Sequence, residues 1–531
     1  MKKIIINILI TLLIGLVIYY FMLPPINITA PEFWTFIIAL LGIYFILSSF
    51  SIITKTTFLK GKINATSFKV NKISYVIISI FLIIILVNFI GSPLFMSRAY
   101  SNRITVQTDK EFYKDVPLVD FSRIPLLDKE SSQKLGDRTM GVMTDLVSQF
   151  YVSNLYTQIN YQDEIIRVTP LEYASMIKYF TNRDEGVKGY IKVNSVNGES
   201  SLVKLSNGMK YMPSAMFFEN LERKLRFLYP TKIFGDMNFE IDNEGNPYWI
   251  VQTITYKGIG IREEVSGVII LDPITGNSNW YKVGDVPSWV DHVYDASLII
   301  EQFDNYGEYK NGFFNSIFGQ KGVVNTTEGY NYLAMNDDIY LYTGVTSVSS
   351  DESNLGFILT NLRTKETTLY NIAGAEEFSA MASAEGAVQE KNYRATFPLL
   401  INLNNKPTYL MSLKDNAGLV KMYAFVDVAD YQKVVVSDAS LGIEAVAKLY
   451  LGENSNINKQ DTIKETITLT EINSAVIDGI TYYYFKDLKN NHYMVSIKTE
   501  KNILPFLKIG DSINISYYED NNIKVITKLT N

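Results

Sequence analysis

The sequence contains no cysteine, and histidine occurs only twice, as His292 and His492, in a chain of 531 residues. The absence of cysteine excludes disulfide bonds, a thiolate nucleophile and every zinc site that uses sulfur ligands. Neither histidine stands in a nucleophile motif, so no Ser-His-Asp triad is indicated. We therefore expect no catalytic, metal-binding or cofactor-binding residues and no enzyme activity.

An excess of positive charge is also lacking, since the formal net charge is −6 at pH 7. Nucleic-acid binding needs concentrated Lys and Arg to neutralise phosphates, so we expect no nucleic-acid partner. Aromatic residues, in contrast, are abundant, with 36 Tyr and 29 Phe. This favours sheets and recognition surfaces over a helical bundle.

Three long apolar runs without a charged residue lie at the N-terminus: Ile4 to Leu23, Phe33 to Ile53 and Ile73 to Phe95. A helix rises about 1.5 Å per residue, so roughly 20 residues cross a hydrocarbon core of about 30 Å. The first run is longer than a signal-peptide core and ends in Pro24-Pro25 instead of a small-residue cleavage site. We predict an uncleaved three-helix transmembrane anchor over residues 1–95.

The distribution of lysine predicts the orientation of this anchor. Lys2 and Lys3 precede the first run, and residues 24–32 contain no basic residue. The loop from Thr54 to Lys72 carries five lysines: Lys55, Lys60, Lys62, Lys69 and Lys72. Because basic loops stay in the cytoplasm, we expect a multi-pass protein of the cell membrane with a cytoplasmic N-terminus. Residues after about 95 are then extracellular, and membrane lipid is one partner.

The outer region mixes helical and strand patterns. Helices are predicted over 131–149 and 170–180, from the N-cap Ser214 onward, and from Pro287 to Gly307. On the third of these, Arg223, Lys224 and Arg226 are expected to face solvent. Between the helices, short apolar runs bordered by turn residues predict antiparallel hairpins, so the fold class is α+β.

An internal repeat divides this region. Gly189-Tyr190-Ile191, Asn194, Glu199 and Leu202 match Gly356-Phe357-Ile358, Asn361, Glu366 and Leu369 at a constant offset of 167. Each copy continues with a helical stretch and a hairpin, which predicts two tandem α+β repeats over residues 96–310 and 311–455. After a polar linker at about Leu451 to Asp461, five short strands predict a small OB-like or SH3-like β-barrel over residues 456–531.

Two segments of the first copy carry a family resemblance. These are Asn246-Pro247-Tyr248-Trp249 and the strand and turn from Gly267 through Asp272 to Thr275-Gly276. This region resembles the PepSY family of small extracytoplasmic α+β domains, and the resemblance implies an accessory role beside an envelope hydrolase. The whole chain also resembles membrane proteins of low-GC Gram-positive bacteria (Firmicutes) with N-terminal helices and an outer domain.

Two groups of residues compete as candidate sites. Asn336-Asp337-Asp338 with Asp351 and Glu352 would suit a calcium site or a glycosidase pair, but polar turns are the preferred interpretation. An aromatic run would make a partner-binding surface if exposed and a seam between the repeats if buried. Its members are Tyr306, Tyr309, Phe313, Phe314, Phe318, Tyr330 and Tyr332.

The function that follows from these patterns is a non-enzymatic, membrane-anchored scaffold or interaction protein of the cell envelope. Its expected partners are other envelope proteins, further copies of itself, or wall polymer. One alternative is a PepSY-type accessory regulator of an envelope hydrolase or peptidase. A second alternative is a carboxylate-based envelope hydrolase.

Overall fold

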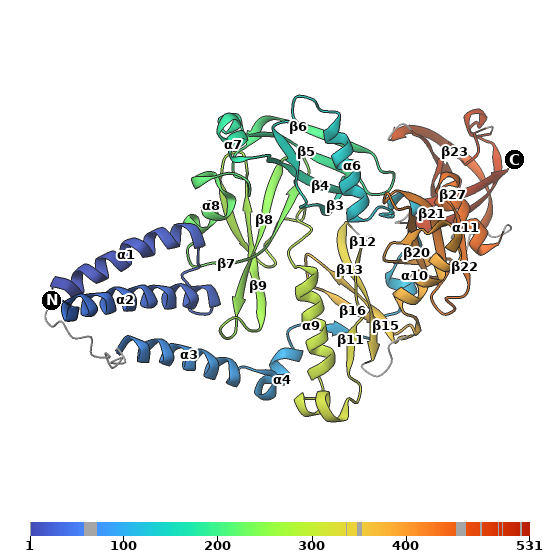
Figure 1. Cartoon of the computed structure of the whole chain (residues 1–531). Coiled ribbons are helices and arrows are strands. Elements are labelled where there is room, and N and C mark those ends of the chain that lie inside the picture. Colours follow the sequence, from blue (N-terminus) through green and yellow to red (C-terminus); the bar gives the residue numbers. More distant parts are fainter. Residues whose placement is uncertain are drawn as a thin grey trace. The chain divides into compact units, whose positions relative to one another are not determined.

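A computed structural model describes the chain except residues 1, 58–71, 336, 348–352, 453–462, 478–479, 498, 502, 521–522 and 531. The chain forms two compact units (Figure 1). The first comprises Met1–Asn402 and Pro407–Tyr450, and the second Leu403–Lys406 and Leu451–Asn531. Most of the lysine-rich loop and of the linker, and the candidate residues Asn336, Asp351 and Glu352, lie outside the described residues.

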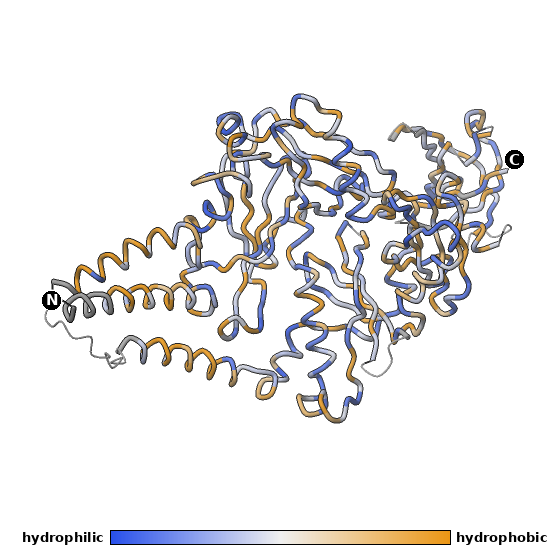
Figure 2. The backbone as a smooth tube through the Cα atoms, viewed as in Figure 1, coloured by the Kyte–Doolittle hydropathy of each residue, from blue (hydrophilic) through white to orange (hydrophobic). Residues whose placement is uncertain are grey.

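The apolar N-terminus forms the helices α1 (Lys2–Met22), α2 (Pro31–Thr57) and α3 (Lys72–Ile90). Hydrophobic residues predominate in the coloured parts of these helices in Figure 2. Two helical stretches are long and apolar enough to cross a membrane, Ile4–Met22 and Pro31–Ser48. The third stretch, Ser74–Ile90 of α3, qualifies only together with the short helix α4 (Pro93–Ser101). The axes of these two helices differ by 55°. The expectation of three transmembrane helices is therefore corrected to two, with α3 and α4 as a bent pair beside them. Pro93 has no backbone N–H to continue the preceding helix.

The first half of the region that follows α4, which we call the outer region after its expected location, is built from two antiparallel sheets. One has the order β2-β4-β5-β6 with β3 on β4, and the other the order β10-β9-β8-β7. The strands are β2 (Phe150–Val152), β3 (Thr157–Tyr161), β4 (Glu164–Tyr173), β5 (Val187–Asn194), β6 (Ser200–Met209), β7 (Ile233–Ile241), β8 (Pro247–Tyr256), β9 (Glu263–Leu271) and β10 (Ser278–Lys282).

The sheet of β7 to β10 is buried on both faces, which explains the uninterrupted apolar runs in β8 and β9. Trp249 and Leu271 belong to a core shared with the β2–β6 sheet. Ile250 and Val268 point the other way, into a core with α9 (Ala296–Tyr309) and the second half. Successive strand residues face opposite sides, so a central sheet needs apolar residues at every position.

The second half follows the same plan. One sheet has the order β1-β16-β15-β13-β11 with β12 on β13, and the other the order β18-β20-β21-β22 with β19 on β20. The strands are β1 (Val106–Gln107), β11 (Val324–Thr326), β12 (Asn331–Met335), β13 (Asp338–Ser347), β15 (Gly356–Asn361), β16 (Thr367–Tyr370), β18 (Arg394–Ala395), β19 (Leu399–Leu403), β20 (Lys406–Lys414), β21 (Val420–Asp427) and β22 (Val434–Asp438). A short pair, β14 (Ser353–Asn354) and β17 (Gly374–Ala375), lies beside them.

Both halves place their elements in one order: a hairpin, two further strands, a helix, a four-stranded meander and a final helix. The helices after the first sheets are α8 (Leu221–Leu228) and α10 (Glu377–Gly386), and the final helices are α9 and α11 (Ile443–Leu451). The turn after β5 and the turn after β15 are alike. The side-chain oxygen of Asn194 accepts from Val196 N, and that of Asn361 from Arg363 N. These are the positions that the sequence repeat matches.

The segment between α4 and the first sheet runs along the second half before the first half begins. It contains α5 (Phe112–Asp115), and β1 pairs in parallel with β16. Val119 N donates to Asn402 O at 2.9 Å, and Ser412 Oγ donates to Leu126 O at 2.7 Å. The N-terminal arm of the outer region thus joins the two halves.

The second unit holds a closed barrel in the order β23-β24-β25-β27-β26. Its strands are β23 (Ile463–Ile477), β24 (Ile480–Asp487), β25 (His492–Ser496), β26 (Ser512–Asp520) and β27 (Ile523–Thr530). Tyr493, Val495 and Leu529 lie in its core. Five strands were expected, although β23 is longer than predicted. The OB-like or SH3-like assignment, the PepSY-like assignment and the four-part domain division stay predictions.

Several predicted helices begin at other residues. Pro170 lies in β4, between the residues that pair with β3 (up to Val168) and those that pair with β2 (from Leu171). The helix predicted to begin there begins later, as α7 (Met176–Asn182). The other helix starts are set by carboxylate or amide caps. Asp128 caps α6 (Lys129–Gly141), Asn220 caps α8, and Asp295 caps α9. Ser214 and Pro287 therefore start no helix.

Candidate functional site

A cavity of about 320 Å³ lies in the first unit, where the N-terminal arm, the first half and the second half meet. Four parts of the fold line it: the arm before α6, the first turn of α6, strand β4, and the two sheets of the second half. The lining residues are Pro125, Leu126, Leu127, Asp128, Lys129, Glu130, Arg167, Tyr330, Asn331, Tyr332, Thr396, Phe397, Leu399, Leu410, Met411 and Ser412.

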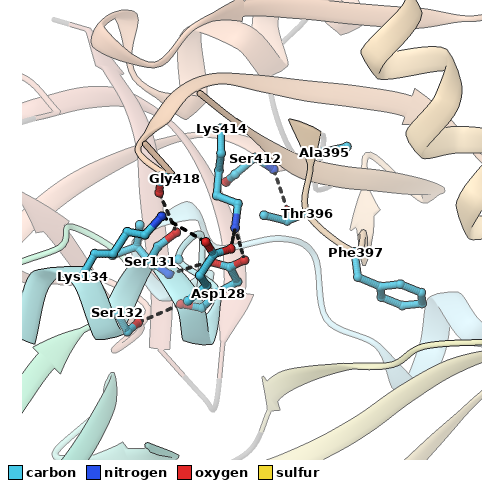
Figure 3. A network of polar contacts seen from close by, with 12 residues as sticks. Asp128, Ser131, Ser132, Lys134, Ala395, Thr396, Phe397, Ser412, Lys414 and Gly418 are labelled. Carbon is cyan, nitrogen blue, oxygen red and sulfur yellow. Dashed lines mark hydrogen bonds and ion pairs between the residues drawn. The ribbon is translucent and has the colours of Figure 1, made fainter. Parts of the chain in front are cut away.

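One wall of the cavity is fixed by an ion-pair network between α6 and the β20–β21 hairpin (Figure 3). Lys414 Nζ lies 2.6 Å from Asp128 Oδ2 and 2.7 Å from Glu130 Oε2. From the helix side, Lys134 Nζ donates to Ala417 O at 2.7 Å. These contacts hold the first turn of α6 against the second half.

The network keeps both carboxyl groups ionised. Burial alone would raise the pKa of Asp128, but hydrogen bonds from Lys414 and from Ser131 hold it below its usual value. The hydrogen bond from Lys414 also lowers the pKa of Glu130. Burial opposes the charge of Lys414, but its two carboxylate partners raise its pKa. At neutral pH, Lys414 is therefore a cation between two carboxylates.

Arg167 is the one buried arginine of the cavity wall, and it has a different environment. It lies on β4 and is only 6% exposed. Its Nη1 donates to Leu127 O and to Ser132 Oγ. No carboxylate of the described residues lies within ion-pair distance of it, but against the effect of burial the nearby charge of Asp128 raises its pKa. The hydrogen bonds of Arg167 in the described part of the chain involve Nη1 and leave Nε and Nη2 without a partner. Burial lowers the pKa of Arg167 to about 10, so it stays charged at neutral pH.

A second cation, Lys129, adds to this positive charge. It lines the cavity, and no ion pair joins it to a carboxylate among the described residues. Burial and the charge of Arg167 together lower its pKa. The cavity lining thus holds two cations, Lys129 and Arg167, and two carboxylates, Asp128 and Glu130, and both carboxylates are paired with Lys414 outside the lining. A buried cation that forms no ion pair of its own is costly, and an anionic ligand would lower that cost.

Another part of the cavity lining is aromatic. The rings of Tyr330 and Tyr332 are 5.5 Å apart, and Asn331 Nδ2 donates to Phe397 O at 3.0 Å. Phe397 packs against Gly329, which adopts a left-handed φ of +88° and where an added Cβ would lie 2.7 Å from the Phe397 ring. The cavity therefore offers flat apolar faces as well as a buried guanidinium.

Behind Tyr332 lies a buried polar layer. The His292 ring meets Tyr332 edge-on at 5.8 Å, and its Nε2 is 2.7 Å from Gln158 O. Burial lowers the pKa of His292, which is therefore neutral at neutral pH. Glu240 accepts the backbone N–H groups of Asp291 and His292, and burial raises its pKa to about 7. This layer supports the cavity wall without lining the cavity.

The seven aromatic residues singled out in the sequence do not form one surface. Tyr330 and Tyr332 line the cavity. Tyr306 lies on α9 beside Phe303, and Tyr309 stacks on Phe313 at 6.4 Å. The rings of Phe314 and Phe318 stack with their centres 6.5 Å apart at the π-helical turn Asn315–Gly319. Phe314 is 65% exposed and Phe318 is 79% exposed. The run is thus divided between α9 with its following turn and the start of β12.

The acidic candidates that the structure describes lie in structural contacts. Asp338 pairs with Arg363 at 2.7 Å, and Asp337 accepts from Asn160 Nδ2 at 2.7 Å in the turn before β13. Within the described ranges, no group of three or more His, Asp or Glu side chains is placed to hold a metal ion. His492 begins β25 in the barrel, and His292 lies in the first unit.

Sequence reasoning missed the residues that make the cavity charged. Arg167 interrupts the apolar run Ile165-Ile166-Arg167-Val168, and a charge in a buried strand is a usable signal. Arg226 was expected to face solvent, but it is 5% exposed and donates to Leu23 O. The approach of Lys414 to Asp128 had no local signal.

Comparisons with known proteins give little. No family model and no curated protein matches the chain. A GH32 β-fructofuranosidase from Bombyx mori in complex with sucrose matches with 9% identity over 76% of this chain and 70% of that chain, at a TM-score of 0.19. An α-L-arabinofuranosidase from Lactobacillus brevis matches with 7% identity over 71% of this chain and 95% of that chain, at a TM-score of 0.16.

These matches correct one expectation. Both solved structures are named as glycosidases, in contrast to the expected non-enzymatic scaffold, and we do not carry that expectation forward. Their TM-scores of 0.19 and 0.16 are too low to place any residue of this chain or to carry an argument about its chemistry. The function must therefore be argued from the cavity.

Proposed function

We propose that the outer region is an accessory regulator of an envelope hydrolase, and that it responds to a small anionic molecule bound in the cavity. The observation that carries the ligand is Arg167, a buried charged guanidinium with two nitrogen atoms left for a ligand. The volume of about 320 Å³ suits a small molecule. The role beside a hydrolase rests on the PepSY resemblance, whose residues lie on β8, β9 and the turn after β9.

The chemistry of the cavity indicates what such a ligand looks like. Its anionic group is a carboxylate or phosphate, because a guanidinium binds these planar or branched oxyanions through paired hydrogen bonds. Its body is flat or apolar, to pack on Tyr330 and Phe397. Lys129 supplies a second positive charge.

The ligand is tested with probes that share a phenyl ring and differ in the charge of their polar group. Thermal unfolding of the detergent-solubilised full chain is followed with benzoate, phenyl phosphate, neutral benzamide and cationic benzylamine. We expect the two anions to raise the unfolding temperature and the others not to. Arg167→Gln should abolish the effect. Arg394→Gln is the control, because the Arg394 side chain is 80% exposed and outside the cavity. Equal stabilisation by benzamide and benzoate would refute the anion site.

The regulatory role needs a separate measurement. Membranes with the parent chain, with the Arg167→Gln variant and without the chain are compared for release of dye from labelled cell-wall material and from a labelled peptide. We expect the parent chain to change one of these rates and Arg167→Gln to lose that change. Rates that are the same in all three membranes would refute the regulator while leaving the ligand site standing.

A second candidate function, a carboxylate-based hydrolase, is favoured by one observation. Asp128 and Glu130 both lie at the cavity and both contact Lys414 Nζ. Glycosidases use such a pair, but one member must carry a proton, and here the pKa of each is held low. Turnover of 4-nitrophenyl glycosides by the purified chain, lost in Asp128→Asn and Glu130→Gln, would replace the regulator by this second function.

A further inference from the structure

The outer end of α1 is tied to α8. The last carbonyl groups of a helix have no partner within the helix. Here Arg223 Nε donates to Tyr20 O at 3.2 Å and Arg226 Nε donates to Leu23 O at 2.9 Å. Just beyond, Ile26 N donates to Pro230 O at 2.7 Å. These bonds hold α8 at the level where α1 ends.

A set of exposed apolar side chains surrounds this junction. Phe227 meets Tyr19 at 6.2 Å, Phe218 meets Tyr20 at 5.9 Å, and the rings of Phe218 and Phe227 are 5.9 Å apart. Phe217 extends the set to Phe180 of α7 at 6.1 Å. We call the set the α7–α8 apolar face: Met176, Ile177, Phe180, Phe217, Phe218, Phe227 and Leu228, each 46–70% exposed.

The depth of this face follows from the span beside it. Ile4–Met22 has 19 residues, and at about 1.5 Å per residue it nearly matches a hydrocarbon core of about 30 Å. Tyr19 and Tyr20 lie in the last turn of this span, so their ring partners Phe227 and Phe218 lie at nearly the same depth. Aromatic side chains are enriched at this boundary between hydrocarbon and headgroups.

The cations of α8 are already used within the protein. Arg223 also donates to Phe217 O at 2.6 Å, Arg226 donates to Lys232 O, and Lys224 Nζ lies 4.7 Å from the centre of the Tyr211 ring. On α8 the cations thus contact other parts of the protein, while the side chains of the α7–α8 apolar face are exposed. A contiguous exposed apolar surface of this kind marks an interaction site.

We propose that the α7–α8 apolar face lies in the interfacial layer of the bilayer that α1 crosses, as a second and non-spanning membrane contact. The occupant is lipid, because the face continues the outer end of a membrane span without a break. The contact holds the outer region against the membrane by apolar burial. Anionic headgroups and salt should therefore not change its depth.

The absence of cysteine makes a direct test simple. Single cysteines are introduced as Phe218→Cys and Ile177→Cys, labelled with a nitroxide, and reconstituted as full chains in phosphatidylcholine vesicles. Spin relaxation by oxygen, which concentrates in lipid, is compared with relaxation by a water-soluble nickel chelate. Leu13→Cys within α1 is the lipid reference. Phe378→Cys on α10, on the side of the unit away from α1 in Figure 1, is the water reference.

We expect the labels at 218 and 177 to favour oxygen, as the label at 13 does, and the label at 378 to favour the nickel chelate. Added phosphatidylglycerol or high salt should leave the values at 218 and 177 unchanged. Labels at 218 and 177 that match the label at 378 would overturn the proposal, as would a water-exposed label at 13. Two positions are used so that a local disturbance at one does not decide the result.

Discussion

The Nζ atom of Lys414 lies 2.6 Å from Oδ2 of Asp128, although 286 residues separate the two in the chain. Asp128 caps α6 in the first half, and Lys414 ends β20 in the second. Their contact closes one wall of the cavity, so the site requires both halves in place. The cavity therefore depends on this ion pair as much as on its own lining.

Lys414→Met should destabilise the first unit. Breaking a buried ion pair on one side costs about 3–5 kcal/mol. The side chains of Asp128 and Glu130 are 32% and 57% exposed, so water screens part of the interaction. We therefore expect the free energy of unfolding to fall by about 2 kcal/mol. Urea unfolding of the detergent-solubilised chain measures it. Lys421→Met, in an exposed pair with Asp415, is the control and should cost under about 1 kcal/mol. Equal losses would show that the buried pair has no special role.

Arg167→Met separates stability from ligand binding. The variant removes a buried charge that forms no ion pair, which should stabilise the folded chain. It also removes two hydrogen bonds, which should destabilise it by about 1 kcal/mol each. We expect the ligand-free chain to keep its stability to within about 1 kcal/mol. Stabilisation by benzoate, followed by thermal unfolding, should disappear. A large loss of stability without ligand would mean that Arg167 is a structural residue.

Gly329→Ala should disturb the aromatic wall. A non-glycine residue in the left-handed region costs about 1–2 kcal/mol, and here the new Cβ also meets the Phe397 ring at 2.7 Å. We expect weaker benzoate binding together with lower stability. Gly284→Ala is matched, because Gly284 has a φ of +93° and no atom within 4 Å of an added Cβ. It should cost stability alone, and a loss of binding in both variants would argue against this role of Phe397.

The buried carboxyl groups should make stability fall as the pH rises. Burial raises the pKa of Glu240 to about 7 and that of Asp304 to about 6. The folded chain therefore holds protons that the unfolded chain releases near pH 3.8 at Asp304 and near pH 4.5 at Glu240. It loses this advantage as the pH rises from about 4 to about 7. The unfolding temperature should drop across that window.

Glu240→Gln tests the origin of this slope. The variant keeps only one acceptor for the N–H groups of Asp291 and His292, so it should be less stable than the parent at pH 5. It cannot titrate, so its unfolding temperature should fall less from pH 5 to pH 7. Asp163→Asn replaces a carboxylate that is 86% exposed and should keep the parental slope. An unchanged slope in Glu240→Gln would assign the effect to other groups.

Features that depend on neighbouring residues were predictable from the sequence. The apolar runs of α1 and α2 need no partner to be recognised, because hydrocarbon accepts a helix whose backbone is internally bonded. The repeat was visible at Asn194 and Asn361 because each side chain bonds the backbone of its own turn. The strands of the barrel were predicted in number for the same reason, since alternation and turn residues lie within a few positions.

Features that depend on distant residues were decided only by the tertiary structure. The charge of Arg167 was visible, but not that it forms no ion pair and that it lines one cavity together with Tyr330 and Phe397. Composition marked Phe218 and Phe318 as apolar but did not show that both are exposed. The physical reason is that burial, ion pairing and cavity shape depend on which surfaces meet, and those contacts join residues hundreds of positions apart.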